Sequence, residues 1–133
     1  MIKMMLIAGV GGFVGTCCRF LIVRLCAGLT GTGAWPAGTL MANLIGCFLF
    51  GIIFGLLEKA CLLSSAQNAL LITGFCGGLT TFSTFANDTL MLTNKGQWLP
   101  AALSLLASLI LGLGLLWTGR TLVYRVERTE FRV

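Results

Sequence analysis

Four long apolar runs constrain this chain more than any other feature. They cover approximately residues 4–27, 36–57, 66–93 and 98–124, with short links between them. Crossing the hydrocarbon core of a bilayer takes about 20 apolar residues, so each run can form one spanning helix. Only 10 % of the residues are charged and 57 % are hydrophobic, which excludes a soluble globular domain and a disordered chain. We predict an all-α membrane protein in which residues 1–133 form one four-span domain, ending in a charged tail over residues 125–133.

The charged residues lie mostly at the edges of these runs. Short links make successive helices antiparallel, so an even number of spans places both termini on the same side of the membrane. Lys3, Lys59 and the tail arginines lie on that side, whereas Arg24 and Lys95 lie on the other. Apart from the tail, these charges balance, which favours insertion in either orientation. Positive charges at membrane edges indicate the lipid bilayer as a partner. The sequence has no basic stripe of the kind that would indicate binding to nucleic acid.

The third run carries the most specific pattern, GFCGGLTTFSTF, over residues 74–85. Adjacent glycines followed by hydroxyl residues disfavour a continuous helix, so we predict a break in mid-membrane at about residues 77–81. Backbone groups freed there need a cavity, an ion or protein as partner, because lipid offers none. After the glycines, the two phenyl rings of Phe82 and Phe85 share one helical face. The polar side chains share another face: Thr80, Ser83, Thr84 and Asn87.

Small and polar residues also lie inside the other three spans. In the first span, Gly11 and Gly15 form a G-x-x-x-G pair that lets another helix approach closely. Arg19 lies deep in the same span, where it either lines an aqueous vestibule or reaches the headgroups. In the second span, one helical face carries Thr39, Asn43, Gly46 and Phe50. Asn43 is either a hydrogen-bonding contact between helices or a donor toward a cavity. The fourth span has a stripe that packing alone would also explain: Ser104, Ser108 and Gly112.

Three motifs, in this order along the chain, carry a resemblance to a known family. They are G-G-x-x-G-x-x-x-R starting at Gly11, G-T-L-x-x-N-x-x-G starting at Gly38, and G-G-L-T-T-F-S-T-F starting at Gly77. In these motifs, in length and in span count, the chain resembles the bacterial fluoride channels called Fluc (CrcB type). The resemblance implies a channel and not an enzyme. It also implies an antiparallel, dual-topology homodimer with two fluoride pores and a central structural sodium ion.

The resemblance further implies roles for individual residues. The implied lining of the fluoride pore is Asn43, Phe82, Phe85, Ser83, Thr84 and Thr39, with either Ser108 or Ser104 supplying the hydroxyl of the fourth span. The two phenyl rings facing a given pore would come one from each subunit. Arg19 would sit at the vestibule, and Gly77 and Thr80 would give backbone carbonyls to sodium. The implied function is passive export of cytoplasmic fluoride across the inner membrane, which protects the cell from fluoride toxicity.

The residue types suit an anion that holds its water tightly. Asn amides and hydroxyls donate hydrogen bonds, and phenyl rings present a positive edge. Conduction also needs weak sites, and the interiors of the spans contain no Lys. Two other functions stay open. A proton-coupled multidrug exporter needs a carboxylate in mid-membrane, for which only Asp88 is available, and a structural membrane subunit would explain the glycines but not the TTFSTF sequence.

Overall fold

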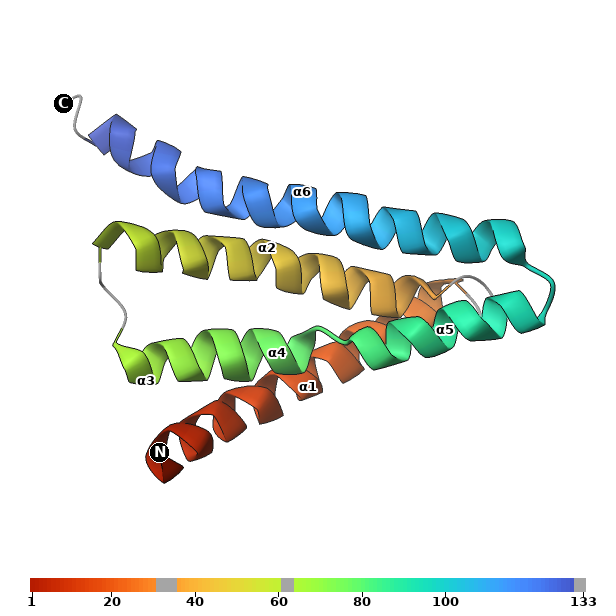
Figure 1. Cartoon of the computed structure of the whole chain (residues 1–133), viewed down its shortest axis with the longest axis horizontal. Helices are drawn as coiled ribbons and strands as arrows, with labels where there is room; N and C mark the ends of the chain where they lie inside the picture. Colours follow the sequence, from red (N-terminus) through yellow and green to blue (C-terminus); the bar gives the residue numbers. More distant parts are fainter. Residues whose placement is uncertain (31–35, 61–63, 131–133) are drawn as a thin grey trace.

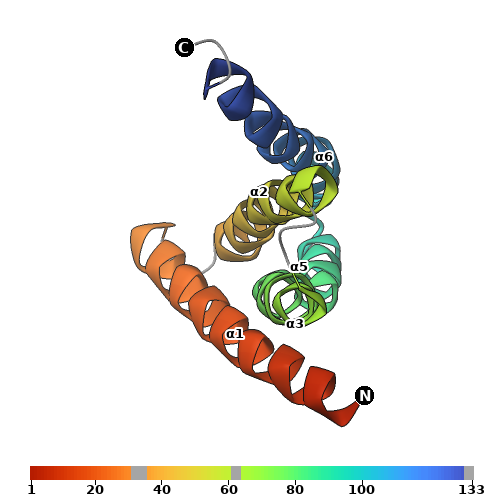
Figure 2. The same cartoon turned by 90° about the vertical axis from the view of Figure 1, so that its left-hand side faces the viewer.

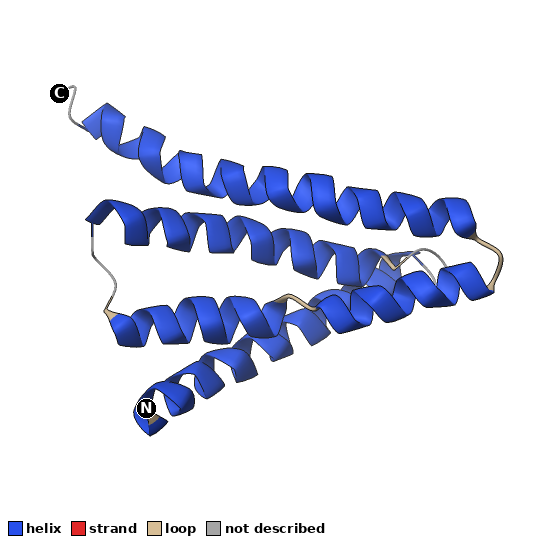
Figure 3. Cartoon of the chain, viewed as in Figure 1, coloured by secondary structure: helices blue, strands red, loops and turns tan. Residues whose placement is uncertain are grey.

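The computed structural model describes residues 1–30, 36–60 and 64–130, and the regular secondary structure of these residues is entirely helical (Figure 3). The elements are α1 (Ile2–Thr30), α2 (Ala37–Ala60), α3 (Ser65–Asn68), the π-helix η1 (Ala69–Cys76), α4 (Gly77–Leu79), α5 (Phe82–Asn94) and α6 (Trp98–Glu130). Four segments are long and apolar enough to cross a membrane: Ile2–Leu29, Ala37–Glu58, Ser65–Asn94 and Trp98–Arg125. The predicted all-α architecture with four long apolar helices is therefore confirmed.

The C-terminal tail is described only in part. Helix α6 continues to Glu130, so the first six residues of the predicted tail extend the fourth helix. The last three residues of the tail, and residues 31–35 and 61–63 within two of the predicted links, lie outside the described residues.

The four spans pack as two pairs of helices (Figures 1 and 2). Helix α2 runs along α6, and α1 crosses the first half of the third span, η1 and α4. Helix α2 also contacts α1 and the third span, so it joins the two pairs. The surface of the single chain is rich in large apolar side chains such as Phe13, Leu113 and Ile110, which is typical of helices that face lipid or another subunit.

Glycines bring α1 and the third span into backbone contact. A β-carbon added at Gly11 would collide with the carbonyl oxygen of Leu70, and one at Gly15 would collide with that of Phe75. From the opposite helix, a β-carbon at Gly78 would collide with the backbone of Gly12. This is the close helix approach that the G-x-x-x-G spacing predicts.

Helices α2 and α6 are joined by glycine contacts and by an ion pair. Gly51 and Gly119 pack against the backbone of the facing helix. Near the C-terminal end of α2, Arg120 of α6 donates from Nε and Nη2 to the carboxylate of Glu58 at 2.7 and 2.8 Å, and the Tyr124 hydroxyl donates to the same carboxylate at 3.2 Å. These contacts fix the rotation of α6 against α2.

The third span is broken at two threonines. Thr80 (φ −83°, ψ 153°) and Thr81 (φ −151°, ψ 123°) are extended, and α5 begins directly after them at Phe82. The predicted break in mid-span is therefore confirmed. Gly77 and Gly78, however, are helical, and Gly78 serves the contact with α1. The π-helix that precedes the break was not predicted from the sequence.

Candidate functional site

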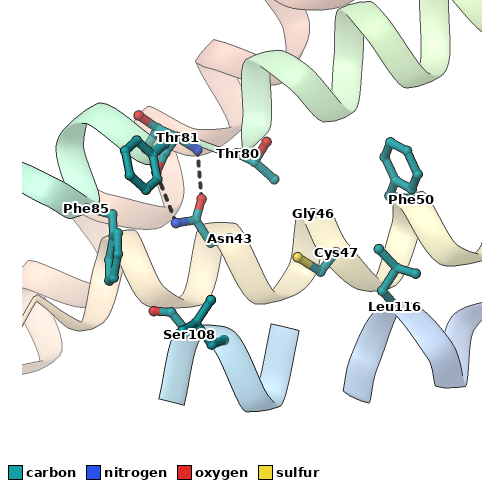
Figure 4. A pocket seen from close by; sticks show the side chains of 11 residues that line it. Asn43, Gly46, Cys47, Phe50, Thr80, Thr81, Phe85, Ser108 and Leu116 are labelled. Carbon is teal, nitrogen blue, oxygen red and sulfur yellow. Dashed lines mark hydrogen bonds between the residues drawn. The ribbon is translucent and has the colours of Figure 1, made fainter. Parts of the chain in front are cut away.

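The helix break is held by the side-chain amide of Asn43 on α2 (Figure 4). The amide nitrogen Nδ2 donates to the carbonyl oxygen of Thr81 at 3.1 Å, and the N–H of Thr81 donates to Oδ1 of Asn43 at 2.7 Å. The amide thus replaces two of the backbone bonds that the break removes from the helix. An Asn amide has two N–H donors, so one N–H remains for another acceptor.

A pocket of about 360 Å³ lies beside this contact, between α2, the break and α6 (Figure 4). It is lined by Asn43, Gly46, Cys47, Phe50, Thr80, Thr81, Phe82, Phe85, Ser108, Leu109 and Leu116. Four of the predicted pore residues are brought together here: Asn43, Phe82, Phe85 and Ser108. The rings of Phe82 and Phe85 are 6.2 Å apart with an interplanar angle of 50°, and Phe82 is 81 % exposed in the single chain.

Ser108 contributes a hydroxyl that is buried without a partner. Its Oγ makes no hydrogen bond within the described chain, although an unsatisfied buried hydroxyl costs about 1–3 kcal/mol. Ser104, the other serine considered for this span, is 1 % exposed and does not line the pocket. The hydroxyl of Ser108 is therefore the one available to a bound species.

Ser83 and Thr84 lie on the exposed side of the break and do not line the pocket. Their hydroxyls are within 3.3 and 3.2 Å of Thr81 Oγ1, and the N–H of Thr84 donates to the same oxygen at 3.4 Å. Thr81 thus caps α5 through its side chain. Together the three hydroxyls form a polar cluster on the outer surface of the third span.

Thr39 is 5 % exposed and lies away from the pocket. Its hydroxyl donates to Oδ2 of Asp88 on α5 at 2.6 Å. The bond ties α2 to α5, near the buried Leu92 and Leu40. Sequence reasoning placed Thr39 on one face with Asn43 but did not predict this partner for Asp88.

Arg19 is half-buried on α1, does not line the pocket and makes no ion pair within the described ranges. The two interpretations of Arg19, aqueous vestibule or headgroup contact, both remain predictions.

The carbonyls of Gly77 and Thr80 are free of hydrogen bonds within the described chain. The N–H of Thr81, which a continuous helix would give to Gly77, bonds to Asn43 instead. The N–H of Thr84, which would bond to Thr80, is within 3.4 Å of Thr81 Oγ1. The described residues contain no group of three His, Cys, Asp or Glu that could hold a metal ion. A cation at this position would therefore have backbone oxygens as ligands, the type that hard cations prefer.

Several lining residues were not assigned to the pore from the sequence. Gly46 and Phe50 were placed on one helical face with Asn43 by their spacing, but no pore role was given to them. Cys47, Leu109 and Leu116 carried no such signal, because their place depends on how α6 packs against α2. With Cys47 as its one ionisable group, the lining offers neutral donors and ring edges, which suit weak binding of a small anion.

Comparison with known proteins agrees with this geometry. A family model described as CrcB-like protein, Camphor Resistance (CrcB), matches residues 6–120. The chain is 41 % identical over 113 residues to a protein of Pseudoalteromonas translucida (strain TAC 125), covering 85 % of this chain and 93 % of that protein. It is 44 % identical over 118 residues to a protein of Chlorobium phaeobacteroides (strain BS1), covering 89 % and 91 %.

Both relatives are named fluoride-specific ion channel FluC. Ion channels are not enzymes, so the prediction that the chain is not an enzyme is confirmed, as is its resemblance to the CrcB type. The four apolar helices and these matches together show that the chain is a multi-pass membrane protein that belongs to the CrcB-like family.

Proposed function

We propose that this chain forms a fluoride-selective channel of the bacterial inner membrane, which exports cytoplasmic fluoride passively and protects the cell from fluoride toxicity. The names of the relatives support fluoride as the transported ion. The observation that carries the proposal is the broken third helix, held by Asn43 in mid-span beside two phenyl rings and the unpartnered Ser108 hydroxyl. Such a set of neutral donors replaces the water around a small anion without trapping it.

In this proposal, the residues that line the pocket form the central part of the pore. Asn43 offers its second amide N–H, Ser108 offers its hydroxyl, and Phe82 and Phe85 offer ring edges. Ser83, Thr84 and Thr39 extend this path as polar groups outside the pocket. Arg19 attracts the anion at the vestibule. Each of these roles is a proposal for this chain.

The functional unit in this proposal is an antiparallel, dual-topology homodimer. Its support is the outer surface of the break, where Ser83 and Thr84 are exposed and Phe82 is 81 % exposed. Hydroxyl groups at this depth require protein or water and not lipid. A second copy covers this surface and contributes one of the two rings at each pore. The few charges in the loops favour insertion in both orientations.

A structural sodium ion fits the same break. Two antiparallel copies related by a two-fold axis bring two sets of free carbonyls together. In this proposal the carbonyls of Gly77 and Thr80 from each copy hold the ion. Bound sodium would supply positive charge that stabilises the clustered carbonyl dipoles, whereas the pore residues bind and orient fluoride. Exchange of sodium for N-methylglucamine during purification should lower the dimer fraction in detergent, and an unchanged dimer fraction would argue against the ion.

The function is tested with purified protein in liposomes. Vesicles loaded with potassium fluoride or potassium chloride are diluted, and efflux is followed with an ion-selective electrode. We expect fluoride to leave and chloride to be retained. Equal efflux of both anions, or efflux of neither, would contradict the proposal.

Two substitutions test the lining, each with a matched control. Phe82→Ile removes a ring edge at the break, and Asn43→Asp places a negative charge there, so both should slow fluoride efflux. Phe13→Ile removes another strongly exposed ring, on α1, and Asn68→Asp changes an exposed amide far from the break. Dimer formation by size exclusion should be kept in all four variants. Unaltered flux in Phe82→Ile and Asn43→Asp would remove the proposed lining.

A further inference from the structure

One side of α6 is apolar and exposed over most of the membrane span. Helix α2 packs against four residues of α6: Leu116, Gly119, Arg120 and Val123. At 100° per residue, the opposite side of α6 carries Leu103, Ile110 and Trp117, and each of these side chains is more than half exposed. We call this side the outer face of α6. The residues of α6 that line the pocket lie away from it: Ser108, Leu109 and Leu116.

Trp117 marks the place where α6 leaves the hydrocarbon core. Trp98 and Trp117 are both strongly exposed, and they lie about 28 Å apart along the axis of α6. This separation matches a hydrocarbon core of about 30 Å, whose two boundaries tryptophan prefers. The first charged residue of α6 is Arg120. The part of α6 that follows, residues 121–130, therefore projects from the membrane, and it lies beyond the match to the CrcB-like family.

Beyond the membrane edge, the outer face becomes basic. Arg125, which is exposed, lies about 80° around the helix from Trp117, and position 128, also an arginine, lies about 20° from it. The acidic positions of this segment, Glu127 and Glu130, fall on the side that faces α2. The arginines thus lie on the side whose apolar residues are exposed within the span, and the acidic residues lie on the opposite side.

Arg125 lies at the level of the lipid headgroups. It is about 8 Å further along the axis than Arg120, and the headgroup layer is about 5–8 Å deep on each side of a bilayer. Side chains of a helix lean toward its N-terminus, which at this end of α6 is the direction of the membrane. In two views, this end of α6 points away from α1 and from the third span (Figures 1 and 2), toward the surrounding bilayer.

We propose that the outer face of α6 binds an anionic phospholipid, with the acyl chains along the apolar residues up to Trp117 and the phosphate at Arg125 and Arg128. Charge complementarity selects the headgroup, because a guanidinium binds phosphate oxygens through paired N–H groups. A zwitterionic lipid carries the same phosphate together with a positive group that the arginines repel. The site is separate from the pocket and from the outer surface of the break, so it does not depend on the proposed channel function.

Quenching of Trp117 fluorescence by brominated lipids tests the site in a bilayer. The full chain, with its other two tryptophans replaced by phenylalanine, is reconstituted in phosphatidylcholine that contains brominated phosphatidylglycerol or brominated phosphatidylcholine. At low ionic strength we expect phosphatidylglycerol to associate about 30-fold more strongly beside Trp117, because each basic residue near an anionic surface contributes about a factor of five. Equal quenching by the two lipids would overturn the inference. Weak quenching by both would also overturn it, because a second copy would then cover this face.

Two double variants, each measured also with the three native tryptophans, assign the preference to the arginines. Arg125→Gln with Arg128→Gln should abolish the preference for phosphatidylglycerol. Arg24→Gln with Lys95→Gln removes the same charge from exposed residues at the other membrane edge and should keep it. The same preference in both double variants would contradict the proposed site. Size exclusion in detergent separates the remaining explanation: a dimer fraction that falls only in the variant of Arg125 and Arg128 would show a contact between subunits in place of a lipid site.

Discussion

The contact between Asn43 and Thr81 gives the sharpest quantitative prediction. Asn43→Leu keeps the size of the side chain and removes both hydrogen bonds, at 3.1 and 2.7 Å. Hydrogen bonds between membrane helices contribute about 0.6 kcal/mol on average, so two of them amount to about 1.2 kcal/mol. The N–H and C=O of Thr81 are then left without partners, and a group left in this way costs about 1–3 kcal/mol. We expect a loss of about 1.2–4 kcal/mol in the local stability of the break, from the two bonds alone up to the two bonds plus one unpartnered group at its full cost.

Hydrogen exchange of the Thr81 amide, measured by NMR in detergent micelles, reads this stability directly. Because about 1.4 kcal/mol corresponds to a factor of ten in an equilibrium constant, the amide should exchange roughly 10- to 1,000-fold faster in Asn43→Leu. The control is Asn68→Leu, which changes an exposed amide without a side-chain cap bond and should leave the Thr81 rate unchanged. An acceleration of less than about threefold in Asn43→Leu would refute the claim that this amide holds the break.

Three further predictions concern packing and charge. Gly15→Ala should lower the thermal midpoint of unfolding in detergent, because its methyl group meets the backbone of the third span at a cost of about 1–3 kcal/mol. The control Gly9→Ala, whose methyl group meets nothing within 4 Å, should leave the midpoint unchanged. Equal midpoints for the two variants would contradict the packing of α1 against the third span. Glu58→Gln removes one charge of an exposed pair with Arg120, so its thermal midpoint should fall less than that of Gly15→Ala and should be insensitive to salt. A larger fall than that of Gly15→Ala would show that the ion pair stabilises the fold more than the glycine contact does. Asp88→Asn keeps an oxygen that accepts from its hydroxyl partner, so fluoride efflux should continue without proton movement; loss of transport together with proton flux would favour a proton-coupled exporter.

The lining of the pocket shows which site residues helical periodicity can predict and which it cannot. Asn43 stood out in the sequence as a polar amide in mid-span, and the family resemblance implied pore roles for Asn43, Phe82 and Phe85. Their convergence was not predictable from periodicity, which ranks the residues of one helix by face but does not say which two faces meet. Cys47 and Leu116 line the pocket because α6 packs along α2 through glycine contacts, and no local pattern encodes that pairing.

The sequence by itself determined that the chain crosses a membrane four times and that its third span is broken. Both follow from local chemistry, since about 20 apolar residues match the hydrocarbon core and glycines and hydroxyl residues disfavour a continuous helix. Only the tertiary structure decided how the break is held. Gly78 serves the contact with α1, because a β-carbon at this position would collide with α1. The break lies at Thr80 and Thr81, where the extended backbone is hydrogen-bonded by the side-chain amide of a residue 38 positions earlier in the chain.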